Sequence, residues 1–98
     1  MISLGQIRAA RAFLHIDQPT LARLAEVSVP TIQRLENPQF GPERSSMRVV
    51  TAVKAALEKS GIEFLPPSDK AGEGVRLPAR GAVFVDQLGT DALGEIGP

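Results

Sequence analysis

Two short helix signals separated by a tight turn, between residues 18 and 35, restrict the fold of this chain more than any other part of its sequence. Asp17 and Ser28 are residues of the kind that cap helix N-termini. Each is followed two positions later by a proline, which loses no hydrogen bond when it lies in the first turn of a helix. The pattern predicts helices over residues 18–25 and 29–36.

The apolar residues of this stretch can share one core only if the two helices cross at a steep angle. They are Leu21, Leu24, Ala25, Val27, Ile32 and Leu35. A pair of capped helices around a small core is therefore the centre of the predicted fold.

This pair resembles the helix-turn-helix of the phage-repressor (Cro-like, or XRE) family of DNA-binding proteins. The matching positions are Gln18 at the start of the first helix, the small residue Ala22 where the helices touch, and the branched residues Ile32 and Leu35 in the second helix. The family usually has glycine at the turn, where this chain has Glu26. A non-glycine residue in a left-handed conformation costs on the order of 1 kcal/mol. The resemblance implies a mostly α, compact four-helix, lambda-repressor-like domain that reads DNA with the second helix of the pair.

A further helix is predicted before this pair. Ser3 followed three residues later by Gln6 is a capping-box pattern, and apolar residues then recur at helical spacing over residues 4–14. His15, the single histidine, stands where the family commonly has glycine. We interpret it as a surface residue that ends the helix, and not as a catalytic base or metal ligand.

A last helix is predicted after the pair. Asn37 followed by proline ends the preceding helix, and Phe40 in the next loop is expected to anchor that loop on the core. Ser45 or Ser46 is the predicted N-cap of a helix that runs to about residue 59, with a glycine following at position 61. Its predicted buried stripe is Met47, Val50, Val53 and Leu57.

Beyond residue 61 the pattern changes from helical to strand-like. Residues 62–65 alternate in polarity, and residues 75–77 form a second strand-like run after a turn-rich segment. We therefore expect a small C-terminal β-hairpin, which needs the helices or another chain to pack against. The predicted division is a helix-turn-helix domain over 1–61, a hairpin segment over 62–85 with a third strand at 82–85, and a flexible acidic tail over 86–98.

The chain has no net charge, but its charges are unevenly distributed. Residues 1–61 hold eight Lys or Arg and five Asp or Glu, a net charge of +3, whereas residues 62–98 hold three and six, a net charge of −3. This asymmetry is expected if only the first part faces DNA phosphates. A random scatter of surface charge is the alternative interpretation.

The composition argues against several other classes of protein. The chain has no cysteine, so it has neither a disulfide framework nor a thiolate metal site. Its first residues lack the continuous apolar core of a signal peptide, and no apolar run approaches the roughly 20 residues that span a membrane. The sequence also lacks a nucleotide-binding loop and a catalytic cluster. We expect a cytoplasmic, non-enzymatic protein that needs no metal or cofactor.

Base recognition by a helix-turn-helix needs an exposed face on its second helix. The 100° step between helical residues places four side chains there, and the resemblance assigns them to base edges in the major groove. Arg34 suits guanine and Gln33 suits adenine. Val29 and Pro30 can only pack on thymine methyl groups. The alternative for Arg34 is a solvated or phosphate-contacting side chain.

Phosphate contacts would position the domain on DNA. The resemblance suggests Gln18 and Thr20 at a helix N-terminus, where anions are favoured. Arg8 and Arg11 are either further phosphate contacts or solubilising residues, and Arg23 and Glu36 are expected to form a structural ion pair. The complete set of candidate phosphate ligands is Gln18, Thr20, Thr31, Arg44 and Ser46.

The predicted function is that of a sequence-specific transcriptional regulator that occupies double-stranded operator DNA. We expect a homodimer joined through residues 62–85, because one recognition helix with apolar residues at its tip reads few bases. The alternative is an antitoxin-like or other protein-interaction module on the same fold. In that case the acidic C-terminal part binds a protein partner, and DNA binding is secondary. Neither function involves a membrane.

Overall fold

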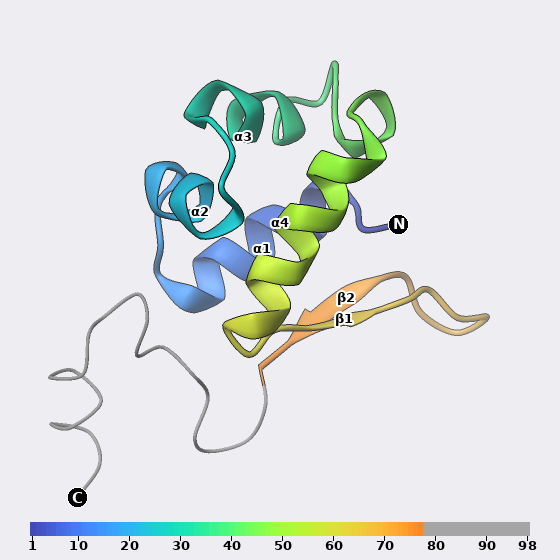
Figure 1. Cartoon of the computed structure of the whole chain (residues 1–98). Helices are drawn as coiled ribbons and strands as arrows, with labels where there is room; N and C mark the ends of the chain where they lie inside the picture. The colour runs from blue at the N-terminus through green and yellow to red at the C-terminus, as the bar shows by residue number, and fades with distance from the viewer. Residues whose placement is uncertain (78–98) are drawn as a thin grey trace, which may run out of the picture.

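The computed structural model of the protein describes residues 1–77, which fold into four α-helices and a small antiparallel sheet (Figure 1). In chain order the elements are α1 (Leu4–Leu14), α2 (Gln18–Ala25), α3 (Val29–Leu35), the 3₁₀ turn η1 (Pro42–Arg44), α4 (Met47–Lys59), β1 (Glu63–Leu65) and β2 (Gly74–Arg76). The prediction of a mostly helical fold with a C-terminal hairpin is confirmed. α3 ends one residue earlier than expected, with Glu36 as its C-cap.

Side chains cap the first three helices as predicted. Ser3 Oγ accepts a hydrogen bond from the backbone N–H of Gln6, and Gln6 Oε1 accepts one from the N–H of Ser3. The side chains of Asp17 and Ser28 accept bonds from N–H groups in the first turns of α2 and α3. Each cap satisfies helix N–H groups that have no partner within the helix.

Two helices end at residues with a left-handed backbone, although neither residue is glycine. His15 ends α1 with φ 58°, as the sequence predicted, and Glu26, where the family usually has glycine, ends α2 with φ 59°. The N–H group of each bonds to carbonyls in the preceding turn. These bonds close the helices and offset part of the cost of the left-handed conformation.

The core is enclosed by the helices, with α2 in contact with both α3 and α4. Leu24 and Val27 of the predicted set are only partly buried against it. Ala22 is buried where α2 packs on its neighbours, as expected for a small residue at a helix contact. The largest fully buried side chains are Ile7, Leu14, Leu21, Ile32, Leu35, Pro42, Val53 and Leu57.

Two predicted core residues are on the surface. Phe40 is 46% exposed, because the fully buried Pro42 takes the anchoring place in that loop. Met47 is 73% exposed, because it is the first residue of α4 and the buried stripe begins one turn later, at Val50. The N-cap of α4 is Ser46, since the hydroxyl of Ser45 donates to the carbonyl of Gly41.

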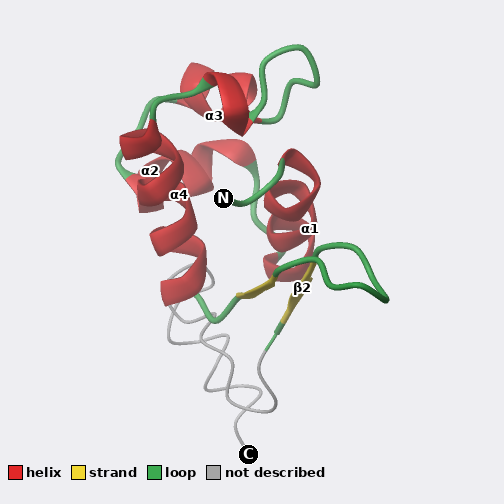
Figure 2. Cartoon of the chain, turned by 90° about the vertical axis from the view of Figure 1, so that its right-hand side faces the viewer, coloured by secondary structure: helices red, strands yellow, loops and turns green. Residues whose placement is uncertain are grey.

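The hairpin is docked on α1 at the end of the molecule opposite α3 (Figures 1 and 2). Phe64 pairs with Val75 in its antiparallel ladder, and both are partly buried against the core. The predicted third strand at 82–85 and the tail at 86–98 lie outside the described residues.

Candidate nucleic-acid interface

The outer face of α3 carries most of the side chains expected to read bases. Pro30, Gln33 and Arg34 are exposed, whereas Val29 is half-buried and packs against the core. The side chain of Ser28 caps the start of α3 by accepting a hydrogen bond from the N–H of Thr31. The fully buried residues Ile32 and Leu35 hold the inner face of the helix on the core. The outer face of α3 is therefore held in place by the core beneath it, but Val29 exposes less surface on that face than Pro30, Gln33 and Arg34.

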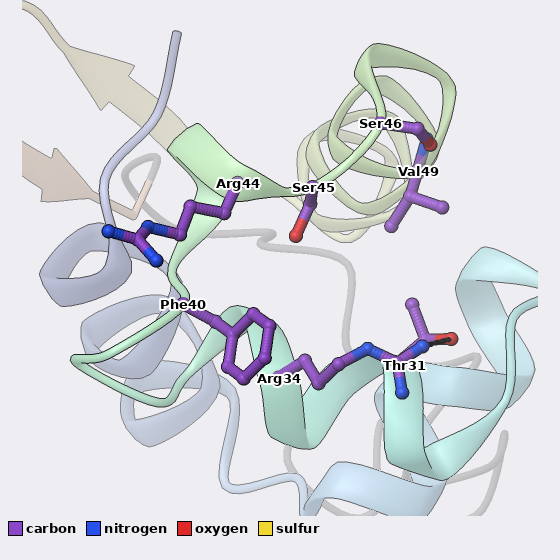
Figure 3. Close-up of a pocket in the computed structure, with 7 residues that line it drawn as sticks. All are labelled: Thr31, Arg34, Phe40, Arg44, Ser45, Ser46 and Val49. Atoms are coloured by element: carbon purple, nitrogen blue, oxygen red, sulfur yellow. Dashed lines mark hydrogen bonds between the residues drawn. The ribbon is translucent and has the colours of Figure 1, made fainter.

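A hollow of about 290 Å³ lies beside this face, between α3, the loop that follows it and the start of α4 (Figure 3). It brings Thr31 and Arg34 of α3 together with two further candidate phosphate ligands, Arg44 and Ser46, from the segment that leads into α4. Phe40, Ser45 and Val49 also line it, and the sequence analysis did not assign them to the site. The residues around this α3–α4 hollow are Thr31, Arg34, Phe40, Arg44, Ser45, Ser46 and Val49.

Arg34 extends along α3 toward its N-terminus and not away from the helix. Its Nη2 donates to Thr31 Oγ1 at 3.4 Å, and Thr31 Oγ1 lies 2.8 Å from Ser28 Oγ. Figure 3 shows the side chain of Arg34 extending along α3 toward Thr31. The contact with the Thr31 hydroxyl places the guanidinium of Arg34 beside the N-terminal half of α3. In DNA-binding helix-turn-helix motifs, this is the part of the second helix that contacts base edges.

The two arginines of the hollow are electrostatically available. The ion pairs within residues 1–77 are Arg11–Glu36 and Arg76–Glu63, so neither Arg34 nor Arg44 has a carboxylate partner there. Arg44 borders the hollow on the side of Phe40 (Figure 3). The N-terminus of α4, capped by Ser46, opens at the same place and adds the partial positive charge of a helix start.

Gln18 and Thr20 lie at the start of α2 and do not line this hollow. Gln18 Nε2 donates to Glu36 Oε1 at 3.2 Å, and the N–H of Thr20 donates to Asp17 Oδ1 at 2.9 Å. Hydrogen bonds from the side chain and backbone of Thr20 lower the pKa of Asp17. The candidate phosphate ligands thus fall into two groups, one at the α2 start and one in the α3–α4 hollow.

The expected ion pair between Arg23 and Glu36 is wrong. Arg11 takes the place of Arg23, with Nε and Nη2 each 2.7 Å from a Glu36 oxygen, and its Nη1 donates to the carbonyl of Ile16. The hydrogen bond with Glu36 raises the pKa of Arg11, although burial partly opposes this shift. Arg23 is exposed on α2. Arg11 therefore stabilises the fold by linking α1 to the end of α3. The signal for this structural role in the sequence was the place of Arg11 among the apolar positions of the first helix.

Within residues 1–77 no three His, Cys, Asp or Glu side chains are grouped so that they could bind a metal ion. None of the helices in that range has the length and apolar character to cross a bilayer. Comparison of the chain with protein-family models, with curated proteins and with solved structures found no match. The function is therefore inferred from the residues and geometry of this face.

Proposed function

We propose that the protein is a sequence-specific DNA-binding regulator of the XRE type, with a lambda-repressor-like arrangement of its helices. The observation that carries this proposal is the α3–α4 hollow, where Arg34 and Arg44, which have no ion-pair partner within residues 1–77, line the same space as the capped N-terminus of α4. The packing of α2 against α3 around a small core also supports it. Such a regulator acts on DNA in the cytoplasm and needs no cofactor.

In the proposed complex, α3 enters the major groove. Gln33 and Arg34 read base edges by bidentate hydrogen bonds, and Pro30 packs on a thymine methyl group. Thr31, Arg44 and Ser46 hold one phosphate strand, while Gln18 and Thr20 hold the other side of the groove through the start of α2. Val29 contributes less, because it is half-buried.

The regulator is proposed to act as a homodimer joined through its hairpin. One short recognition helix supplies few specific contacts, so two half-sites about 34 Å apart are needed for useful specificity. Leu65 supports this contact, since it is only partly buried on β1 and does not belong to the apolar residues packed on the core. A strand edge that carries an apolar residue pairs readily with another chain.

The test begins with selection of a binding site from random duplexes. Arg34→Ala is expected to fold normally and to lose about 1–3 kcal/mol of binding to the selected site, with little change on scrambled DNA. Lys59→Ala is the matched control, because it removes the same charge from the far end of α4. Equal losses on both DNAs would make Arg34 a phosphate ligand. Failure to select any site would contradict the proposed function.

A protein-interaction module of the antitoxin-like type is the second candidate function. The observation in its favour is that Phe40 and Met47, both large and apolar, are exposed close to the α3–α4 hollow. Exposed apolar patches are a mark of protein–protein contact sites. Affinity capture with Phe40→Ala and Met47→Ala variants, compared with Phe13→Ala on α1, would test it. A partner lost only by the first two variants supports this function.

A further inference from the structure

The face around the α3–α4 hollow combines positive charge with exposed apolar surface. Arg34 and Arg44 have no ion-pair partner within residues 1–77, and Arg48 follows in the first turn of α4. Glu43, next to Arg44, is the adjoining carboxylate and forms no ion pair with it there. Phe40 adds an aromatic ring that is 46% exposed. A natural ligand for such a face is an acidic chain that also carries apolar side chains.

The sequence contains a segment with this composition beyond the hairpin. Residues 81–98 contain three carboxylates and no lysine or arginine. Branched apolar residues alternate with these carboxylates along the segment. In chain order the two kinds of residue are Asp86, Leu88, Asp91, Leu93, Glu95 and Ile96.

The segment is long enough to reach the hollow from the end of β2. The hairpin and α3 lie at opposite ends of the molecule, whose extents are 43 × 36 × 18 Å (Figures 1 and 2). An extended chain spans about 3.3 Å per residue, so Asp91 can lie roughly 46 Å beyond Leu77 and Glu95 roughly 59 Å beyond it. Both distances exceed the longest dimension, so the acidic residues can reach the hollow even by the longest straight route.

We propose that residues 86–98 dock on the α3–α4 hollow of the same chain and compete there with DNA phosphate. Their carboxylates pair with Arg34 and Arg44, and their apolar residues cover Phe40. A tethered segment acts at an effective concentration of about millimolar, so even a weak contact is populated. The contact itself follows from charge and reach, whereas its effect on DNA binding rests on the proposed function.

The test uses two full-length variants that raise the net charge equally. Asp86→Asn/Asp91→Asn/Glu95→Gln neutralises the tail, and Glu58→Gln/Asp69→Asn/Glu73→Gln is the matched control on exposed residues of α4 and the hairpin loop. Amide resonances of Thr31, Phe40 and Ser46 are followed by NMR, without DNA. We expect them to shift in the tail variant and to stay in place in the control. Unchanged resonances in both variants would overturn the proposal.

DNA binding provides the second readout, with a duplex of arbitrary sequence. The tail variant is expected to bind up to about tenfold more tightly than the native chain at low salt, since the exposed ion pairs with Arg34 and Arg44 that it removes are each worth a few-fold. This ratio should approach one as salt rises and screening shortens to about 3 Å near 1 M. An equal increase in DNA affinity in the control variant would mean that net charge alone causes the effect, and it would overturn the proposed competition between the tail and DNA.

The outcomes separate this inference from the proposed function. Shifted resonances in a chain that binds no DNA would support the tail contact and contradict the regulator. Shifts that grow with protein concentration would mean that the tail docks on a second copy, which overturns the contact within one chain. Normal DNA binding with unchanged resonances would leave the regulator intact and remove the tail from its mechanism.

Discussion

At the scale of single residues, Glu36 is the side chain that links three helices, α1, α2 and α3. It ends α3, and its carboxylate accepts hydrogen bonds from Arg11 of α1 and Gln18 of α2. Its side chain is only 5% exposed, so the carboxylate has lost most of its hydration. The pair with Arg11 and the bond from Gln18 compensate for that loss.

Glu36→Gln is expected to destabilise the fold by roughly 2–3 kcal/mol, because it leaves the guanidinium of Arg11 partly buried without a charged partner. The measurement is urea unfolding followed by circular dichroism. Glu63→Gln is the control, since it breaks an ion pair with Arg76 in which both side chains are more than half exposed. That change should cost below about 1 kcal/mol. Equal costs would show that the Glu36 network adds nothing beyond a surface pair.

Asp17 gives the fold a dependence on acid pH. Its pKa is lowered from 3.8 in the folded chain, first by its hydrogen bond with the side chain of Thr20 and then by the backbone N–H. The ionised form therefore stabilises the fold fully above the unfolded pKa, and this contribution is lost as pH falls through the lower folded pKa. Asp17→Ser keeps a cap without a titrating group. Thermal melts should lose less stability below pH 4 in this variant than in the native chain, and identical profiles would contradict the assignment.

At the scale of elements, the helices were predictable because their signals are local. Each cap at Ser3, Asp17 and Ser28 bonds a residue three positions away, so sequence spacing alone identifies it. The pairing of Arg11 with Glu36 spans 25 residues and depends on how three helices pack, which no local pattern encodes. Phe40 was placed wrongly for the same reason, since its neighbour Pro42 fills the core first.

The candidate site divides in the same way. The exposed face of α3 followed from helical periodicity, whereas the hollow beside it did not. Its aromatic wall, Phe40, and its side chains from α4 come from segments whose position depends on the 3₁₀ turn η1. The direction of that turn is set by Gly41, whose φ is 70°. Glycine adopts positive and negative φ about equally readily, so the sequence alone does not reveal which direction the turn takes.

The close contact of α2 with its neighbours predicts the effect of a larger side chain there. Ala22→Leu should overpack the helix contact and cost roughly 1–3 kcal/mol, because Ala22 is only 3% exposed and extra methyl groups would have to fit into the core. Thermal unfolding is the measurement. Ala55→Leu, on the exposed side of α4, is the control and should change stability little. An unchanged melting temperature for the first variant would mean that α2 yields to the added volume.

Gln6 joins α1 to the hairpin in a way that can be tested separately from its cap. Its Nε2 donates to the carbonyls of Gly74 at 2.9 Å and Leu65 at 3.2 Å, while its Oε1 completes the capping box with Ser3. Gln6→Glu keeps the cap but puts a carboxylate against two carbonyls. We expect faster amide hydrogen exchange in β1 and β2, with little change in α1. Uniform changes across the chain would contradict this division of roles.

At the scale of the whole molecule, the hairpin decides the oligomeric state in our proposal. Leu65→Lys places a charge at the proposed contact and should convert the dimer into a monomer, which sedimentation equilibrium over a range of concentrations would show. Phe13→Lys is the control, because Phe13 is 43% exposed on α1. A native chain that stays monomeric at high concentration, or a Leu65→Lys variant that still dimerises, contradicts the proposed contact.

The bonds that Gln6 makes also bear on the order in which the chain assembles. They join residues 59 and 68 positions apart, whereas the helices pack on neighbours that are closer in the sequence. Closing a loop of that length costs conformational entropy that only the finished helical core can repay. The hairpin should therefore join a helical nucleus late in folding, and a chain emerging from the ribosome would form the α3 face that we propose reads DNA before it forms the hairpin that we propose joins two subunits.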